Sequence, residues 1–222
     1  MNSLLTQFSS GIATVGERVL PAVVQIRNGR AGAGTGIIWR SDGVIVTNAH
    51  VVSHRQVSQQ ALTVRMADGR EFTPRLLAID PEADLAVLRI DAHDLPAIEL
   101  GNSQQLKPGE LVFAFGFPWG VAGGATSGVV IGVGTQVGDL FSPQHEWVTA
   151  SLHLRPGHSG GPMVDANGRL IGINTLMNGP DVGVAVPVDI AKRFIQANAN
   201  QWHSALPDTG LQFVGNTRIV QV

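Results

Sequence analysis

Residues 155–163 read Arg-Pro-Gly-His-Ser-Gly-Gly-Pro-Met, and the interpretation of the whole chain depends on them. Ser159 lies among glycines between two apolar, strand-like runs, so we expect it on a turn. Gly157 has no Cβ and can adopt backbone angles that direct its own N–H and the N–H of Ser159 into one pocket. Two such N–H groups can stabilise an oxyanion. A glycine-rich hairpin turn, whose serine bonds only its own backbone, explains these residues equally well.

A serine nucleophile needs a base, and the base needs an orienting carboxylate. Two upstream segments contain candidates, namely residues 47–52 (TNAHVV) with His50 and residues 81–88 (PEADLAVL) with Asp84. In each segment the polar residue adjoins an apolar run. The chain order is therefore His50, Asp84, Ser159, as in chymotrypsin-type double barrels, and differs from the order in subtilisins and in α/β-hydrolases.

The segments TNAHVV, DPEADLAVL and PGHSGGP resemble the three signatures of the HtrA (DegP-like) branch of trypsin-fold serine proteases. The resemblance covers roughly residues 20–195 and includes residues 34–36 (GTG), 100–103 (LGNS), 126–128 (TSG) and 171–175 (IGINT). It implies an all-β fold of two six-stranded barrels with short helices at both ends. It also implies a serine endopeptidase of the protein quality control type, which cleaves unfolded or extended polypeptides through an acyl-enzyme, without cofactor or metal ion.

The same resemblance implies a role for each motif residue. His50 would be the general base, and Asp84 would orient it and stabilise its imidazolium form. Histidine suits this task because its side chain exchanges protons near neutral pH. The backbone N–H groups of Gly157 and Ser159 would form the oxyanion hole.

The specificity pocket is expected between the residues that precede Ser159 and the segment 173–184. Its predicted lining is apolar and consists of Leu152, Leu154, Ile173 and Leu176. No acidic residue is expected in it, so the residue before the cleaved bond (P1) should be a small or medium aliphatic one. The substrate backbone would pair with Asn174, Thr175 and Leu176 by strand addition.

Composition supports an all-β domain. The chain has 222 residues with 27 glycines and only 14% charged residues, which favours many short strands and tight turns. A net charge of −2 with scattered basic residues argues against nucleic acid, so the expected partner is a polypeptide substrate. The chain has no cysteine and hence no disulfides, and it is compatible with either redox compartment.

The chain divides into an N-terminal helical segment (1–21), a protease domain (22–200) and a tail (201–222). Within the domain we expect one barrel at about 22–90, a linker at 91–109, a second barrel at about 110–187 and a helix at 188–200. An amphipathic helix is predicted over residues 9–20, with Ile12, Val15 and Val19 on one face and Ser9 or Ser10 as its cap. The tail weakly resembles the opening of a PDZ domain but is too short to contain one.

Alternating apolar segments predict six strands for each barrel. In the first barrel they are Val23–Ile26, Thr35–Trp39, Val44–Thr47, Leu62–Met66, Phe72–Ile79 and Leu85–Ile90. In the second they are Leu111–Phe115, Ala125–Gly132, Trp147–Ser151, Pro162–Val164, Leu170–Asn174 and Gly183–Val186. Asp-Gly pairs at residues 42–43 and 68–69 indicate hairpin turns.

The sequence leaves the compartment open. No apolar run approaches the ~20 residues that would span a membrane. The first seventeen residues contain no Lys or Arg and no unbroken apolar stretch, so no secretory signal is visible. The absence of a visible signal is compatible with a cytoplasmic protein, whereas the resemblance implies a periplasmic or secreted one. The resemblance also implies a homotrimer.

Three alternatives can be weighed against the triad. Residues 157–161 also match the G-x-S-x-G motif of α/β-hydrolases, but Pro162 and the turn that follows predict a hairpin where that fold needs a helix. His50 and His54 have the spacing of zinc ligands on a helix, yet Val51 stands where a zinc protease needs glutamate. A peptide-binding or chaperone-like module with a non-competent oxyanion loop stays open.

Two positions depart from the family pattern. The family usually has asparagine directly before the serine, where this chain has His158. It also has an aspartate in a Thr-Asp-Ala run of the preceding strand, and residues 149–151 here read Thr-Ala-Ser, with Ala150 in the aspartate's place. The effects of His158 and Ala150 on the oxyanion loop are not determined by the sequence.

Overall fold

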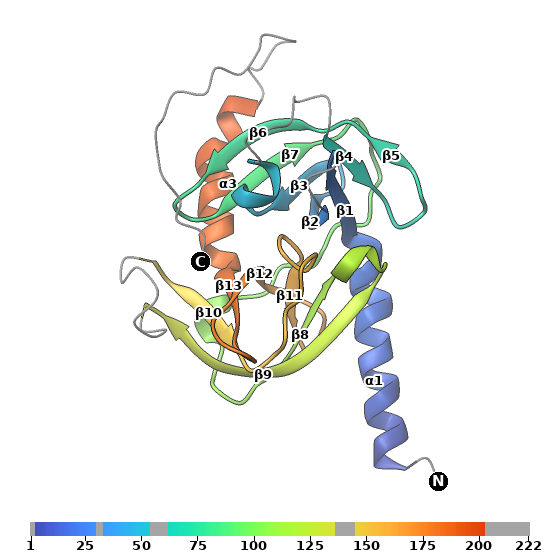
Figure 1. The fold of residues 1–222 in the computed structure, drawn as a ribbon, viewed down its shortest axis with the longest axis vertical. Coiled ribbons are helices and arrows are strands. Elements are labelled where there is room, and N and C mark those ends of the chain that lie inside the picture. Colours follow the sequence, from blue (N-terminus) through green and yellow to red (C-terminus); the bar gives the residue numbers. More distant parts are fainter. Residues whose placement is uncertain (1–2, 30–32, 54–61, 136–144, 203–222) are drawn as a thin grey trace.

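Two antiparallel β-sheets, formed by consecutive halves of the chain, make up most of the structure (Figure 1). The computed structural model describes residues 3–29, 33–53, 62–135 and 145–202. The first sheet contains β1 (Val23–Asn28), β2 (Ala33–Arg40), β3 (Val44–Thr47), β4 (Leu62–Arg65), β5 (Glu71–Phe72), β6 (Arg75–Asp80) and β7 (Leu85–Arg89). The second contains β8 (Leu111–Gly116), β9 (Gly124–Gly134), β10 (Trp147–Ala150), β11 (Pro162–Asp165), β12 (Leu170–Met177) and β13 (Gly183–Pro187).

The first sheet has seven strands in the order β5-β4-β1-β2-β3-β7-β6, one more than the sequence predicts. The segment Phe72–Ile79, predicted as one strand, is divided between β5 and β6, which lie at opposite edges of the sheet. Pro74 lies between them, and proline has no N–H to donate to a strand neighbour. Only residues 73–74 separate β5 from β6, although these strands lie at opposite edges of the sheet. The sheet must therefore curl strongly, as a half-open barrel does.

The second sheet is a closed barrel of six strands in the order β10-β13-β12-β11-β8-β9. Each strand occurs where the sequence predicts it, although β9 and β12 are longer than expected. The pairing of β12 with β13 shifts register between Asn174 and Leu176, and this irregularity lies next to the candidate catalytic serine.

Helix α1 (Leu4–Val19) begins earlier than predicted. Ser3 is its cap, since the Ser3 side chain accepts the Thr6 N–H, and the prediction of Ser9 or Ser10 was wrong. Residues 4–8 contain no helix breaker, so the helix continues back to the first available cap. Val15 and Val19 are buried as predicted, and Ile12 packs against the core. The 3₁₀ turn η1 (Leu20–Ala22) connects the helix to β1.

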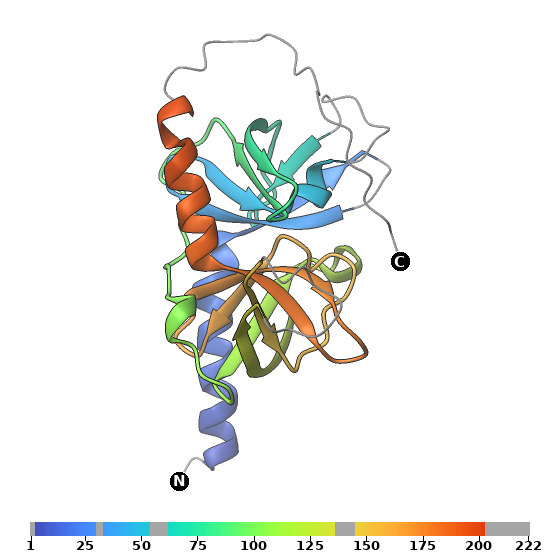
Figure 2. The ribbon, with the colours of Figure 1, turned by 90° about the vertical axis from the view of Figure 1, so that its left-hand side faces the viewer.

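Helix α3 (Val188–Trp202) starts directly after β13 at the boundary between the two sheets and runs alongside the first one (Figure 2). Val188, Ala191 and Ile195 are buried, while Ile190 and Phe194 are partly buried against the same core. The predicted tail, residues 201–222, lies outside the described residues except for its first two residues, which end α3. None of the described helices is long and apolar enough to cross a membrane.

One apolar core joins the two halves of the molecule. It includes side chains of both sheets, α1 and α3, and a second, smaller cluster fills the interior of the closed barrel. The two sheets are therefore fixed relative to each other by burial of shared apolar surface. Side chains from different sheets that meet at this boundary can therefore be held in position as precisely as side chains within one sheet.

Candidate active site

His50 and Asp84 are brought together by the pairing of β3 with β7. The register sets Thr47 opposite Ala86, so the end of β3 lies beside the start of β7. His50 follows on α2 (Ala49–Val52), a single helical turn. Its Nδ1 lies 2.8 Å from Oδ2 and 3.0 Å from Oδ1 of Asp84, and its backbone N–H donates to Oδ1 at 3.0 Å.

The carboxylate of Asp84 is held from both sheets. The preceding turn is closed by Asp80, whose Oδ1 accepts the N–H groups of Glu82 and Ala83. Asp84 itself has a φ of +51°, a left-handed conformation that aspartate tolerates better than most residues. Asn48 donates its side-chain amide to the Asp84 carbonyl at 2.9 Å, and the Thr175 hydroxyl donates to Asp84 Oδ2. The carboxylate therefore has little freedom to leave His50.

Ser159 lies on the turn before β11, and its hydroxyl donates to the Thr175 carbonyl at 3.1 Å. Within the described part of the chain, no hydrogen bond joins this hydroxyl to His50. Thr175 thus contacts both ends of the predicted triad, through its hydroxyl to Asp84 and through its carbonyl to Ser159. Hydrogen bonds between a catalytic serine and histidine are often long without substrate and tighten in the complex.

The glycines around Ser159 are required by close backbone contacts. Gly157 has a φ of +103°, and a Cβ there would lie 2.2 Å from the Phe117 carbonyl oxygen. Gly160 has a φ of +81°, and a Cβ there would lie 2.1 Å from the Thr35 carbonyl oxygen. The backbone N–H groups of Gly157 and Ser159 have no hydrogen-bond partner among the described residues. Both donors are thus available to an incoming oxygen atom.

Thr35 connects the first sheet to this loop, a role the sequence does not reveal. Its hydroxyl donates to the Gly157 carbonyl at 2.6 Å and accepts the Phe117 N–H at 3.1 Å. Its backbone N–H donates to the Ser159 carbonyl at 2.8 Å, and its own carbonyl accepts the Thr47 hydroxyl at 2.7 Å. The only sequence signal is the GTG segment at residues 34–36, in which threonine reads as an ordinary strand residue.

His158 is buried, with only 1% of its surface exposed. Its Nδ1 accepts the Arg155 backbone N–H at 3.0 Å and so closes the turn that carries Gly157. Its Nε2 is buried and has no hydrogen-bond partner in the described part of the molecule. Burial lowers the pKa of His158, because the imidazolium would lose its hydration.

The lowered pKa of His158 predicts a specific loss of stability in acid. The unfolded chain binds a proton at this position more readily than the folded protein does, so stability is complete above about pH 6.5 and falls as the pH decreases below that value. Between pH 7 and pH 5.5, we expect wild type to lose more unfolding free energy than His158→Asn. Urea titrations at both pH values measure this difference. His93→Asn, at an exposed site, is the control, and parallel losses in wild type and His158→Asn would contradict the prediction.

The residues predicted to line the specificity pocket differ in exposure. Leu152, Leu154 and Ile173 are buried, whereas Leu176 is 39% exposed. Leu176 follows Thr175, which bonds Ser159, and we call residues 156–161 the catalytic turn because they carry this candidate nucleophile. Asn174, predicted to pair with the substrate backbone, uses both of its backbone groups within the structure, because its N–H donates to the Gly161 carbonyl and its carbonyl accepts the Gly160 N–H. Its side-chain amide also donates to the Pro162 carbonyl. Asn174 therefore fastens the catalytic turn to β12 and has no free backbone group for a substrate.

Two alternatives can be compared with the structure. The chain continues from the catalytic turn into β11, so the helix that an α/β-hydrolase requires after its serine is absent from this described segment. His54, the second histidine of the zinc alternative, lies outside the described residues.

Ala150, which occupies the place of the family aspartate, is buried in the core of the closed barrel. The next residue, Ser151, is exposed, and its hydroxyl accepts the Val129 N–H at 3.3 Å.

A curled sheet and a closed β-barrel, with histidine and aspartate from the first facing a serine turn from the second, define the chymotrypsin-like class of folds. Comparison with known families finds a match to "Trypsin-like peptidase domain" over residues 34–173, which include His50, Asp84 and Ser159. The chain belongs to this family of trypsin-like peptidase domains, and its similarities place it in the HtrA branch.

The relatives support this placement. Serine protease HTRA1 of Xenopus laevis is 34% identical over 204 residues, which cover 86% of this chain and 43% of that protein. A probable periplasmic serine endoprotease DegP-like of Marinomonas is 36% identical over 73% of this chain and 34% of its own length. Among solved structures, the HtrA-type protease AlgW with tripeptide has a TM-score of 0.74 and 33% identity, covering 83% of this chain and 62% of that one. The chain therefore spans less than half the length of these curated relatives.

Proposed function

We propose that the protein is a serine endopeptidase that cleaves unfolded or extended polypeptides. The observation that carries the proposal is the position of Asp84, whose carboxylate accepts hydrogen bonds from His50 and from Thr175. Because His50 Nδ1 is engaged by this carboxylate, Nε2 is the nitrogen left to accept a proton. A neutral histidine oriented in this way is the base that an activated serine requires.

The proposed reaction begins when the Ser159 hydroxyl rotates from the Thr175 carbonyl toward His50 Nε2. Nε2 accepts the hydroxyl proton while Oγ attacks the carbonyl carbon of the scissile peptide bond. The two free N–H groups of Gly157 and Ser159 then hydrogen-bond the oxyanion of the tetrahedral intermediate. Asp84 stabilises the imidazolium that forms on His50.

The C–N bond breaks as the imidazolium of His50 donates its proton to the leaving nitrogen, and the acyl group stays on Ser159. Water then enters, His50 accepts one of its protons, and the acyl-enzyme is hydrolysed to a carboxylic acid and free Ser159. Every proton and bond in this cycle is accounted for by His50, Ser159 and water, so the proposed reaction needs no cofactor.

Labelling with a fluorophosphonate tests the proposal directly. This reagent forms a covalent bond with a serine only where the hydroxyl is activated and an oxyanion hole is formed. We expect stoichiometric labelling of Ser159, located by mass spectrometry of tryptic peptides, and loss of labelling in His50→Ala. A folded protein that binds unfolded polypeptide without being labelled would instead support the peptide-binding or chaperone-like module.

Cleavage specificity gives a further prediction. The apolar side chains near the catalytic turn, including the exposed Leu176, favour an aliphatic P1 residue such as Val, Ala or Leu. Lys or Arg would leave an unpaired charge in apolar surroundings, which is costly. A peptide library analysed by mass spectrometry should therefore show aliphatic P1 residues at most cleavage sites. A dominant preference for Lys or Arg would contradict the position assigned to the pocket.

The resemblance to HtrA proteases also leads us to propose a homotrimer. Sedimentation equilibrium of the purified protein tests this assembly, and a mass equal to one chain of 23.4 kDa would contradict it.

A further inference from the structure

One residue of the first sheet, Thr35 in β2, bonds the catalytic turn at two points. Thr35 is completely buried. Its side-chain hydroxyl donates to the Gly157 carbonyl at 2.6 Å, and its backbone N–H donates to the Ser159 carbonyl at 2.8 Å. Gly157 and Ser159 are also the residues whose N–H groups are free. Thr35 therefore holds both ends of the short segment 157–159 that would form the oxyanion hole.

The orientation of the Gly157 carbonyl affects where both free N–H groups point. A peptide unit is planar, so a hydrogen bond to its carbonyl fixes the plane of the whole unit. The unit that contains the Gly157 carbonyl lies between the units that contain the N–H groups of Gly157 and Ser159. Rotation of this middle unit would move these N–H groups apart, and they could no longer bind the same oxygen atom.

The backbone of Gly157 does not prevent such a rotation by itself. Its φ is +103°, but glycine adopts positive and negative φ values at similar energy. The observed conformation must therefore be maintained by contacts with the rest of the molecule. The Thr35 hydroxyl makes the shortest hydrogen bond to the Gly157 carbonyl among the described residues.

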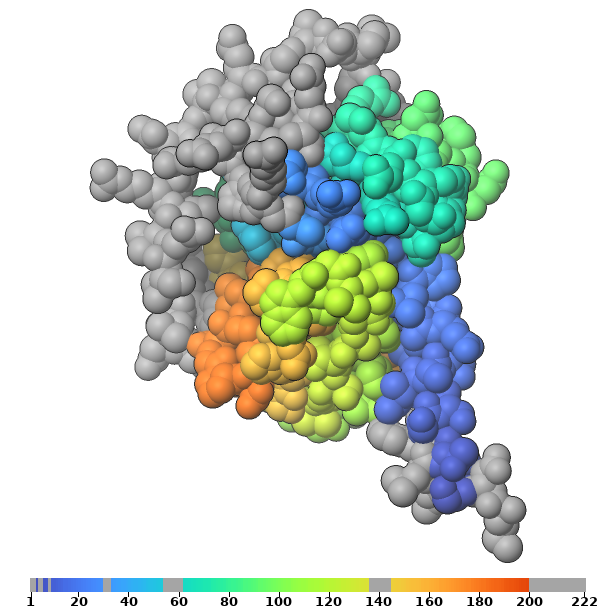
Figure 3. All heavy atoms as spheres, turned by 45° about the vertical axis from the view of Figure 1, so that its right-hand side comes forward, coloured from blue at the N-terminus to red at the C-terminus, as the bar shows by residue number. Residues whose placement is uncertain are grey.

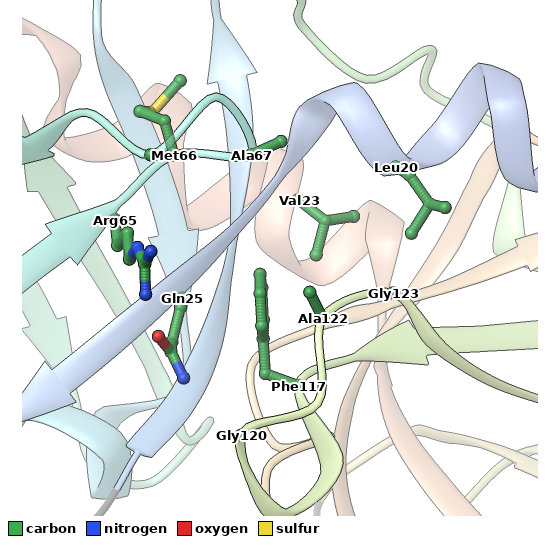
Figure 4. A pocket seen from close by; sticks show the side chains of 11 residues that line it. Leu20, Val23, Gln25, Arg65, Met66, Ala67, Phe117, Gly120, Ala122 and Gly123 are labelled. Carbon is green, nitrogen blue, oxygen red and sulfur yellow. The ribbon is translucent and has the colours of Figure 1, made fainter.

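The 117–123 loop of the second sheet also contacts the turn, but it borders a cavity. The Phe117 N–H donates to the Thr35 hydroxyl at 3.1 Å and to the Gly157 carbonyl at 3.2 Å. Its ring lines a cavity of about 330 Å³ at the boundary between the two sheets, together with Leu20 and Val23 (Figure 4). In the space-filling view, the yellow-green loop lies directly below the teal surface of the first sheet (Figure 3). Close packing is interrupted there, so this loop has less support than Thr35 has within β2.

The surroundings of the Thr35 hydroxyl are tightly packed. A Cβ on Gly116 would lie 2.9 Å from Thr35 Oγ1 and 3.0 Å from the Gly157 carbonyl oxygen. The Thr47 hydroxyl donates to the Thr35 carbonyl at 2.7 Å and so fastens Thr35 to β3. Without the Thr35 hydroxyl, the buried Gly157 carbonyl would keep only the longer bond from Phe117 among the described residues. Loss of a hydrogen bond by a buried acceptor is unfavourable, so the observed orientation of the turn would become less stable.

We propose that the Thr35 hydroxyl is the positioning group of the oxyanion hole, which holds the Gly157 carbonyl so that the N–H groups of Gly157 and Ser159 point to one place before substrate binds. Thr35 contacts neither the substrate nor the reacting atoms and acts through the turn. This inference rests on the proposed peptidase function, because the two N–H groups contribute to catalysis only if Ser159 attacks a carbonyl carbon.

The kinetic test uses Thr35→Val, which removes the hydroxyl and keeps the shape of the side chain. We expect kcat on a p-nitroanilide substrate to fall about tenfold and KM to stay within about twofold, because the N–H groups bind the oxyanion more strongly than the substrate carbonyl. Thr35→Ser retains the hydroxyl and should keep kcat within about threefold of wild type.

Thr149→Val is the matched control. Thr149 is also buried in a strand, β10, and its hydroxyl donates to a backbone carbonyl, that of Gly132, at 3.0 Å. Its loss should leave kcat and KM unchanged. If Thr35→Val does not fold, Thr35→Ala, which is smaller and also lacks the hydroxyl, replaces it in each measurement.

Inhibition by a peptidyl trifluoromethyl ketone separates positioning from a loss of folded enzyme. Ser159 Oγ adds to the ketone carbon, His50 accepts the hydroxyl proton, and the ketone oxygen becomes an anion that the two N–H groups bind. The Ki does not depend on the concentration of folded enzyme. We expect it to rise about tenfold in Thr35→Val and to stay near the wild-type value in Thr35→Ser.

Three kinetic outcomes would overturn the proposal and leave the peptidase proposal intact. Unchanged kcat and Ki in Thr35→Val would show that the hydroxyl does not position the turn. A fall in kcat without a rise in Ki would indicate a loss of folded enzyme only. Equal losses in Thr35→Ser and Thr35→Val would assign the effect to packing of the side chain and not to its hydroxyl.

Hydrogen exchange tests the turn independently of catalysis. The His158 N–H donates to the Arg155 carbonyl at 2.9 Å, and the Phe117 N–H donates to Gly157. Both should exchange about tenfold faster in Thr35→Val than in wild type and Thr149→Val. Unchanged exchange at both groups, measured by mass spectrometry of peptic peptides, would overturn the proposal. If fluorophosphonate does not label the wild type, the peptidase proposal fails, and faster exchange would still show that Thr35 holds the turn.

Discussion

Ser159→Ala is expected to reduce kcat/KM on an unfolded protein such as casein by on the order of 10⁶, or about 8 kcal/mol of transition-state stabilisation. The substitution removes the atom that we propose attacks the substrate, and it leaves only substrate binding and the two free N–H groups. Folding should change little, because Ser159 loses a single hydrogen bond to the Thr175 carbonyl. We therefore expect the unfolding free energy to stay within about 1 kcal/mol of wild type.

Ser151→Ala is the matched control for this experiment. Ser151 is an exposed serine in the segment that leads to the catalytic turn, and within the described residues its hydroxyl makes a single hydrogen bond, accepting the Val129 N–H. Ser151→Ala removes one hydroxyl as well, and we expect its kcat/KM to stay within about a factor of two of wild type, because most surface substitutions have small effects. Casein cleavage by highly purified Ser159→Ala at a rate near that of wild type would eliminate the serine mechanism.

Asp84→Asn is expected to lower kcat by roughly 10⁴. The amide would present an N–H₂ group to His50 Nδ1 or to the Thr175 hydroxyl, where the carboxylate now accepts from both. His50 would then favour the tautomer that carries its proton on Nε2, and this tautomer cannot accept the proton of Ser159. The change removes one charge and almost no volume, so the fold should persist.

Steady-state kinetics on a p-nitroanilide substrate measure the expected loss of kcat in Asp84→Asn. A thermal unfolding curve shows whether the fold persists. Asp42→Asn makes the same chemical change in the β2–β3 hairpin, where Asp42 pairs with Arg40 and Arg89, and should leave kcat unchanged. If Asp84→Asn retained more than about a tenth of the wild-type kcat, Asp84 would not orient the base.

Local signals in the sequence predict most of the strands. Alternating apolar residues and Asp-Gly turns predict the positions of β1 to β4 and β7 to β13 because both features depend on neighbouring residues. The long segment Phe72–Ile79 was predicted as one strand, since period-two alternation does not show where a strand passes from one edge of a sheet to the other. Pro74 is the local clue to that break.

The sequence by itself determined the strand segments, the apolar face of α1 and the candidates His50, Asp84 and Ser159, because each lies in a short motif with its own local pattern. Only the tertiary structure decided how the catalytic turn is held. Thr35 reaches Gly157 across 122 positions of sequence, and Thr175 reaches Asp84 across 91. It also decided that Asn174 is occupied by the turn, and that Leu152 and Leu154 are buried. Such contacts depend on how two separately formed sheets pack across a shared core, and no periodicity within either segment encodes that packing.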